Sequence, residues 1–261
     1  MGTKNRRRST PRQTPAGALT EEQLSGFGFA GDLSFEQRRR VLAETVVRSI
    51  RKGSYICRKG TPVTHWYGVL EGLVKIFSAS SEGKVVTFTG IPAGGWFGEG
   101  SLLKPDPWRY DVVALRDSLI ACVPRNTFHL LLDINLAFSR FLLTQLNARL
   151  SQFIGMVEFD RLLRPEARLA HELAALFDKQ LYPWKRARLE ISQEELAYLV
   201  GLSRQRVNRA LQQLQQAGLV SVAYGLIEVT DLDGLRRFNW PASDGNAHSR
   251  RARHPRAQKG G

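Results

Sequence analysis

The sequence predicts a mixed α+β protein in which a β-rich segment, one long helix and a small helical segment with a β-hairpin follow one another. Three observations support this order. Short β-branched and aromatic runs punctuated by glycine fill residues 54–123. Residues 137–159 contain no proline and carry apolar side chains at helical spacing. Two further apolar stripes at helical spacing, separated by Gly201, occupy residues 191–214.

The composition is that of a globular protein with a polyanionic partner. Of the 261 residues 43% are hydrophobic, and 38 Lys+Arg against 24 Asp+Glu give a formal net charge of +14. Such a charge favours nucleic acid or an acidic membrane surface as the partner. Both ends of the chain are basic and poor in apolar side chains. We therefore predict disordered basic tails at residues 1–25 and 239–261.

Several function classes are disfavoured. Two cysteines, Cys57 and Cys122, are too few for a disulfide framework, a structural zinc site or a four-thiolate iron–sulfur cluster. No apolar segment follows the arginines at positions 6–8, and an acidic residue breaks the longest apolar run, around Leu130, so neither a signal peptide nor a membrane span is expected. The five histidines lack ligand or triad spacing, and no Walker loop is present. We expect a cytoplasmic protein that has no metal site and is not an enzyme.

The β-rich segment has the strand lengths and close turn signals of a small barrel or jelly roll. We predict a short helix from Phe35 to about Arg51 before it and another from Asn126 to Ile134 after it. Residues 26–136 are assigned to this β-roll domain.

The long helix carries a narrow apolar stripe. Its positions alternate steps of three and four, as in the seam of a two-stranded coiled coil: Leu143, Leu146, Leu150, Phe153 and Val157. Polar side chains flank the stripe at Gln145, Arg149 and Gln152. A stripe that only packs on the β-domain is the alternative, but it would be broader. We predict a dimerisation helix at residues 137–163 and a homodimer.

A new helix is expected from Pro165 to about Asp178, because proline is tolerated in the first turn of a helix but not in its interior. Arg164 and Pro165 then form a hinge between domains. Farther along, two short β runs flank Ala223-Tyr224-Gly225 as in a hairpin.

Between these elements lie two short helices joined by a tight turn. Ser192 and Glu195 form a capping box that starts the first helix at Gln193. Gly201 can take the left-handed conformation that ends it, and Ser203 caps the second helix. The inward face of the second helix is apolar: Val207, Ala210, Leu211 and Leu214. This is the pattern of a helix-turn-helix with a hairpin wing, which we assign to residues 164–238.

The outward face of the second helix suits a DNA major groove. Arginine can bridge guanine, and glutamine or asparagine can bridge adenine, each contact discriminating by about 1–3 kcal/mol. The candidate DNA-binding residues on this helix are Arg204, Gln205, Arg206, Asn208 and Arg209. Ser203, Gln193 and the helix N-termini would hold phosphates. A helical hairpin used only for packing would share the stripe and the glycine but not this cationic, amide-rich face.

The order of β-roll, long helix and winged helix-turn-helix resembles the Crp/Fnr family of bacterial transcription regulators over residues 30–235. The resemblance implies base contacts from Arg204, Gln205 and Arg209. A cyclic-AMP-binding member of the family has glutamate where this chain has Gln205. A carboxylate suits cytosine whereas an amide suits adenine, so the half-site should differ from that member's.

A second stretch, "GWFGEGSLL", resembles the phosphate-binding segment of the family. The implied effector-binding residues are Gly98, Glu99, Gly100, Ser101, Arg109 and Tyr110. A buried cyclic phosphate needs a guanidinium and free backbone N–H groups, and a glutamate can accept from a ribose hydroxyl. Alternatively, the glycines shape a corner of the β-roll and Glu99 pairs with Arg109.

Two departures from the family pattern bear on which effector, if any, the β-roll binds. Tyr110 stands where nucleotide binders usually have a small hydroxyl residue. Phe153 and Ile154 stand where the cyclic-AMP-binding member has hydroxyl residues that contact adenine. A cyclic nucleotide, another small anion or nucleotide, and no small ligand all remain open. The cysteine count excludes the iron–sulfur cluster of Fnr-like oxygen sensors.

These observations predict a dimeric, sequence-specific DNA-binding transcriptional regulator that reads a palindromic operator and contacts RNA polymerase. An event in the β-roll would reorient the hinge and change the spacing of two recognition helices. The alternative is a nucleotide-sensing signalling module whose C-terminal domain docks a protein rather than DNA.

Overall fold

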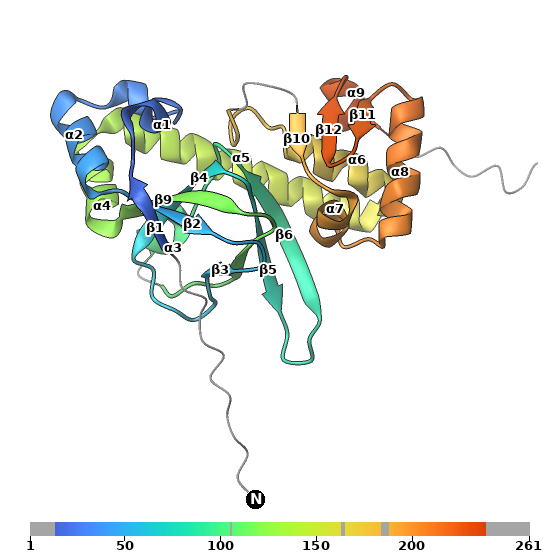
Figure 1. Ribbon diagram of the computed structural model, residues 1–261, viewed down its shortest axis with the longest axis horizontal. Coiled ribbons are helices and arrows are strands. Elements are labelled where there is room, and N and C mark those ends of the chain that lie inside the picture. The colour runs from blue at the N-terminus through green and yellow to red at the C-terminus, as the bar shows by residue number, and fades with distance from the viewer. Residues whose placement is uncertain (1–13, 105, 163–164, 184–187, 239–261) are drawn as a thin grey trace, which may run out of the picture.

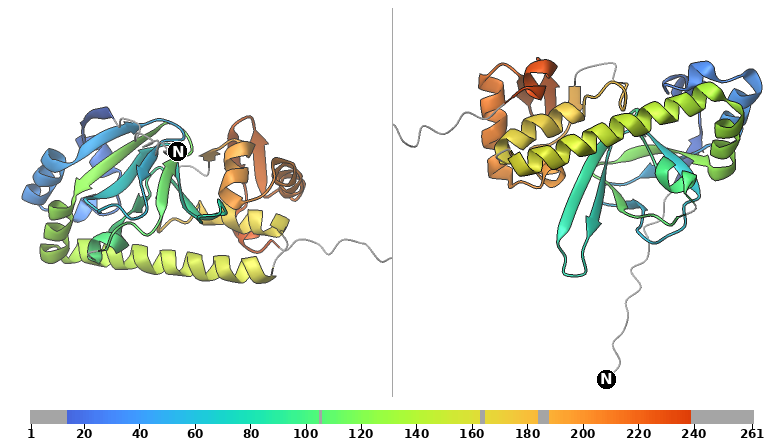
Figure 2. Two further views of the ribbon diagram at one scale, coloured as in Figure 1. Left: turned by 90° about the horizontal axis from the view of Figure 1, so that it is seen from below. Right: turned by 180° about the vertical axis from the view of Figure 1, so that it is seen from behind.

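The computed structural model describes residues 14–104, 106–162, 165–183 and 188–238. It has two lobes joined by one long helix, α5 (Leu136–Leu162) (Figure 1). Figure 2 shows α5 running along both lobes, with the β-rich first lobe at its N-terminal half and the second lobe near its C-terminal end. No helix in the described ranges is long and apolar enough to cross a membrane.

The first lobe contains two antiparallel sheets. One has the strand order β1-β2-β9-β4-β7, at Thr14–Ala18 (β1), Val46–Ile50 (β2), Ser118–Pro124 (β9), His65–Glu71 (β4) and Trp96–Phe97 (β7). The other has the order β3-β8-β5-β6, at Tyr55–Cys57 (β3), Asp111–Ala114 (β8), Leu73–Ala79 (β5) and Val85–Pro92 (β6). Buried residues from both sheets share one core, in which Trp66 stacks on Trp96 at 3.8 Å between ring centroids. This is the predicted β-roll.

Four α-helices and one 3-10 turn complete the first lobe: α1 (Glu21–Ser25), the 3-10 turn (Ala30–Asp32), α2 (Phe35–Glu44), α3 (Glu99–Leu103) and α4 (Arg125–Ile134). The helix predicted from Asn126 to Ile134 is confirmed as α4. The helix predicted from Phe35 to about Arg51 is wrong in its second half, because β2 begins immediately after α2. The β-branched residues there alternate between buried and exposed positions, with Val47 and Ile50 in the core, so they pair with β9 rather than extend the helix.

Regular structure begins earlier in the chain than predicted, at β1. We predicted disorder over residues 1–25, yet β1 pairs with β2 as an edge strand and α1 follows it. Thr20 caps α1 with a capping box, and Leu24 is fully buried in the core. These local signals outweigh the low apolar content of the segment. Residues 1–13 and the predicted tail at 239–261 lie outside the described residues.

The second lobe is the predicted order of helices and hairpin. Its elements are α6 (Pro165–Ala175), β10 (Arg188–Glu190), α7 (Gln193–Val200), α8 (Arg204–Gln216), β11 (Val220–Ala223), β12 (Leu226–Val229) and α9 (Leu232–Arg236). The strands form an antiparallel sheet of order β10-β12-β11. The predicted hairpin is confirmed, with its turn at Tyr224-Gly225. Helix α6 starts at Pro165 as predicted; Arg164, the other predicted hinge residue, lies outside the described residues.

Helix α5 has an inward and an outward face. Beyond Leu136 at its first position, the large apolar side chains of α5 that are at least half exposed are Leu143, Leu150, Ile154 and Val157. The predicted seam residues Leu146 and Phe153 are instead partly buried. Three polar residues that we placed beside the seam point inward instead: Gln145, Arg149 and Gln152. Gln145 donates to the carbonyl of Gln180 in the loop after α6, whereas Arg149 and Gln152 donate to the Trp96 carbonyl and the Thr89 hydroxyl of the first lobe. They occupy the opposite side of the helix from the apolar stripe.

The two lobes are in direct contact. Leu73 and Leu115 of the β-roll are buried in the core of the second lobe. Gly90 on β6 allows α7 to approach closely, since a Cβ there would lie 2.9 Å from a methyl carbon of Leu199. The second lobe is thus docked on β5 and β6.

Candidate DNA-binding and effector sites

The first helix of the helix-turn-helix begins as the sequence predicts. The Ser192 hydroxyl accepts a hydrogen bond from the Glu195 backbone N–H at 3.1 Å, and the Glu195 carboxylate accepts one from the Ser192 N–H at 2.7 Å. This reciprocal capping box satisfies two backbone donors at the start of α7. The buried positions of α7 include Leu196 and Leu199.

The turn between α7 and α8 depends on one glycine. Gly201 has φ 67°, ψ 27°, the left-handed conformation that side chains disfavour. The Leu202 N–H then donates to the Ala197 carbonyl at 3.2 Å, and the Ser203 hydroxyl accepts from the Arg206 N–H at 3.3 Å. The turn therefore ends α7 and caps α8 within three residues.

Helix α8 is divided into a buried and an exposed face. Val207, Ala210, Leu211 and Leu214 are at most 1% exposed. The predicted DNA-binding residues of α8 all lie on the exposed face: Arg204, Gln205, Arg206, Asn208 and Arg209. Their amides and guanidinium groups project from the first two turns of the helix. Gln193, at the start of α7, donates to Asn208 Oδ1 at 3.5 Å, so one side chain of α7 joins this face.

The predicted effector segment forms a sharp corner in the β-roll. Gly98 has φ 102° and precedes α3, whose residues Glu99 and Ser101 are buried; Gly100 is exposed. A Cβ on Gly98 would lie 2.9 Å from the Trp108 ring, so both the backbone conformation and the space require glycine.

Glu99 and Arg109 do not meet. The Arg109 side chain is 76% exposed and pairs with Asp106 at 2.8 Å. Glu99 instead faces Arg149 of α5, with Glu99 Oε1 3.6 Å from Arg149 Nε and both side chains largely buried. Neither a pairing of Glu99 with Arg109 nor an inward-facing Arg109 is found in this conformation.

The buried pair is only partly satisfied. Arg149 Nη2 donates to the Trp96 carbonyl at 2.9 Å. Within the described ranges, Glu99 Oε2 and the Nε and Nη1 atoms of Arg149 are buried and have no well-aligned hydrogen bond, although the Tyr182 side chain also interacts with this guanidinium group. Tyr110 lies beside both charges, and burial, together with the Glu99 carboxylate, holds the pKa of its phenol well above the ordinary value. This corner thus presents an unused acceptor on Glu99 and unused N–H groups on Arg149.

The comparisons with known proteins agree with this geometry. A cyclic nucleotide-binding domain model matches residues 47–135, and a Crp-like helix-turn-helix domain model matches residues 167–238. The chain is 30% identical over 167 residues to the cyclic AMP receptor protein of Thermus thermophilus. The aligned region covers 63% of this chain and 74% of that protein. The chain belongs to the Crp/Fnr family.

Two further likenesses extend the match. The transcriptional regulator SdrP of Thermus thermophilus is 29% identical over 199 residues, 75% of this chain and 94% of that protein. The structure of FixK2 from Bradyrhizobium japonicum matches with a TM-score of 0.61 at 20% identity, covering 76% of this chain and 99% of that one, which supports the fold alone. As a Crp/Fnr protein the chain is a DNA-binding transcriptional regulator and not an enzyme. The predicted fold and function class are confirmed.

Sequence reasoning missed two arginines of this Crp/Fnr protein. Arg149 was assigned to the flank of the seam, although it pairs with Glu99 inside the first lobe. Arg116 was not singled out, although it connects the lobes by pairing with Glu190 and Glu195. Arg149 could have been suspected only weakly from the sequence, from its place on the side of the long helix opposite the apolar stripe. The partners of Arg116 are far away in the sequence, so no local pattern points to them.

Proposed function

We propose that this Crp/Fnr protein acts as a homodimer whose two α8 helices read the half-sites of a palindromic operator. The observation that carries the proposal is the division of α8. A fully buried apolar face fixes the helix, while Arg204, Gln205 and Arg209 are free to reach base edges. Ser203 and Gln193, at the start of α8 and α7, are placed to contact phosphates.

The dimer seam is proposed on the outward face of α5. Leu143, Leu150, Ile154 and Val157 succeed one another in steps of seven, four and three along the helix and are exposed in the single chain. A second copy of α5 would remove this stripe from water, as in a two-stranded coiled coil. A bound dimer at a promoter then meets RNA polymerase, which we propose as its protein partner, in the cytoplasm where bacterial DNA lies.

The effector site is proposed between Glu99 and Arg149. The free acceptor on Glu99 suits a ligand hydroxyl, and the free donor on Arg149 suits an anionic or carbonyl oxygen, so the corner fits a small ligand that carries both. A cyclic nucleotide meets this description. Its phosphate would reach Arg109 only after the ion pair with Asp106 opens.

A mobility-shift titration on promoter fragments tests the DNA-binding function. We expect sequence-preferring binding that weakens steeply with salt, because phosphate contacts release counterions. A protein with Arg204→Ala and Arg209→Ala should lose the sequence preference. A module that docks a protein instead of DNA would show neither the preference nor its loss.

The effector is tested separately by calorimetry against a panel of cyclic nucleotides, with Arg149→Ala and Arg109→Ala as variants. Binding that is lost in Arg149→Ala supports the Glu99 corner, and binding untouched by both variants contradicts it.

A further inference from the structure

A cavity of about 330 Å³ lies between α5, α6 and the loop after α6, and it is closed on one side by β6. Its described lining includes no residue of α3 or α8, so it is separate from both sites above. Apolar side chains form much of the wall: Phe88, Met156, Phe159 and Leu181. The aromatic rings and the thioether would suit a flat apolar group.

One polar wall group is an unsatisfied amide oxygen. The Thr89 hydroxyl donates its proton to the Gly90 carbonyl at 3.1 Å, so it can only accept from Gln152, whose Nε2 lies 3.2 Å away. This fixes the orientation of the Gln152 amide. Its Oε1 is buried and has no partner among the residues that the structure describes.

Two further acceptors lie on α6. His171 stacks on Phe159 at 4.0 Å between centroids, and a hydrogen bond to the backbone of Phe238 uses one ring nitrogen. Its Nε2 is buried and lacks a partner within the described part of the chain. Burial lowers the pKa of His171 and so favours the neutral ring, in which the nitrogen opposite the bond to Phe238 is an acceptor. The next residue, Glu172, adds a half-buried carboxyl group to the same wall.

The cavity therefore combines an apolar wall with two buried acceptors that have no partner among the described residues, Gln152 Oε1 and His171 Nε2, and with the carboxyl group of Glu172. We propose that it binds a small aromatic amine, whose ring lies against Phe88 and Phe159 and whose N–H groups donate to Gln152, His171 and Glu172. Because α5 belongs to the dimer helix and α6 to the DNA-binding lobe, such a ligand would hold the two lobes at one relative orientation.

Burial raises the pKa of Glu172 to about 7, against the opposing charge of Arg168. Arg168 only partly offsets this rise in pKa, so an ammonium group on a ligand would add a second favourable charge beside the carboxyl group. Two other charged side chains line the wall, and both already have partners. Asp178 accepts hydrogen bonds from backbone N–H groups, and Arg236 forms an ion pair with Asp233.

Calorimetry of the full-length protein with tryptamine tests the proposal, with indole-3-propionate as the matched acid. We expect tryptamine to bind once per chain and the acid not to bind, since its carboxylate would face three acceptors. Glu172→Gln should weaken tryptamine binding by at least about tenfold, because a charge-assisted hydrogen bond is lost. Glu194→Gln, an exposed glutamate of α7, is the control and should leave binding unchanged.

A second variant, Ala175→Phe, fills the cavity and should abolish binding in protein that still unfolds cooperatively. Absence of tryptamine binding to the wild type, equal binding of the acid, or an unchanged affinity in Glu172→Gln would each overturn the proposal. These outcomes are independent of the mobility shift, so failure here leaves the DNA-binding function standing.

Discussion

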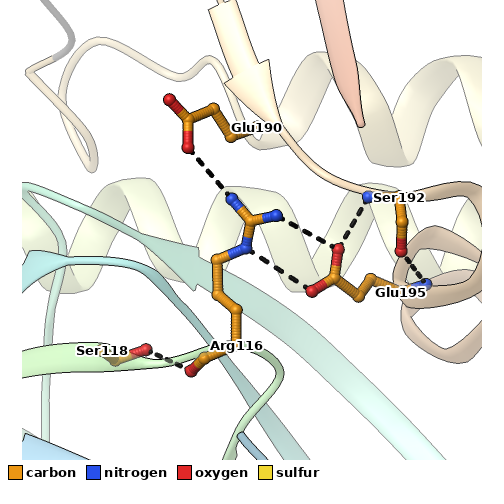
Figure 3. Close-up of polar contacts among 5 residues, drawn as sticks. All are labelled: Arg116, Ser118, Glu190, Ser192 and Glu195. Atoms are coloured by element: carbon orange, nitrogen blue, oxygen red, sulfur yellow. Dashed lines mark hydrogen bonds and ion pairs between the residues drawn. The ribbon is translucent and has the colours of Figure 1, made fainter. Parts of the chain in front are cut away.

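Arg116 of the β-roll contacts both carboxylate oxygens of Glu195, which belongs to the capping box at the start of α7. Arg116 Nε and Nη2 each lie 3.5 Å from one oxygen of Glu195, and Nη1 lies 3.2 Å from Glu190 (Figure 3). Glu195 is 4% exposed and also accepts the Ser192 N–H. One guanidinium group from the first lobe thus contacts the residue that starts the first helix of the DNA-binding motif.

Arg116→Ala should lower the free energy of unfolding by about 1.5–3 kcal/mol, because it leaves the buried Glu195 carboxylate without its cation. Chemical denaturation measures the loss. Arg39→Ala is the control: Arg39 and Glu36 form a pair whose side chains are 71% and 69% exposed, so this change should cost less than about 0.5 kcal/mol. Equal losses in the two variants would show that the contact between the lobes is not maintained in solution.

Arg209→Ala should weaken binding to a specific operator by about 1–3 kcal/mol and relax the preference for one base pair, while non-specific affinity changes little. Its side chain is exposed, so folding stability should stay within about 0.5 kcal/mol of the wild type. Fluorescence anisotropy on operator variants measures both effects. Arg51→Ala removes the same charge from the first lobe; if it reduces specific affinity as much, the role of α8 is wrong.

Replacing Leu150 and Ile154 together with glutamate should convert the dimer to a monomer, because four exposed apolar positions of α5 supply the proposed seam and charges would oppose each other across it. Sedimentation equilibrium measures the mass. Phe35→Glu changes an apolar side chain of α2 that is 76% exposed and should leave the dimer intact. A double variant that still sediments as a dimer would place the interface elsewhere.

The stability should depend on pH through Glu172. Burial raises its pKa from 4.5 to about 7, so the folded protein holds a proton that the unfolded chain releases between these values. The stabilisation is complete below the lower value and is lost as the pH rises through the higher one.

Glu172→Gln cannot ionise, so the unfolding free energy of the wild type relative to this variant should fall between about pH 5 and pH 8. His171, whose lowered pKa acts in the opposite direction, is present in both proteins and largely cancels. A difference that stays constant with pH would contradict the buried position of this carboxyl group.

Local signals made the second lobe predictable. The capping box at Ser192, the left-handed Gly201 and the cap at Ser203 each act within a few residues, and all three occur as predicted. The hairpin turn at Tyr224-Gly225 is equally local. In such segments propensity, capping and apolar spacing agree, so the sequence alone determines the arrangement.

Long-range contacts were not predictable. Glu99 pairs with Arg149 and not with Arg109, because α5 brings a distant arginine to the corner while Arg109 finds Asp106 three residues away. The pairing of β1 with β2 depends on a sheet edge that only the folded lobe provides. The Arg116–Glu195 contact likewise exists only because Leu73 and Leu115 dock the two lobes together.

In vitro selection of DNA sequences by the purified protein tests whether the two α8 helices of one dimer read DNA together. We predict enrichment of an inverted repeat whose half-site centres lie about 34 Å apart, one helical turn, as two α8 helices of a dimer require. Enrichment of a single asymmetric site, or of no sequence above the starting pool, would contradict it.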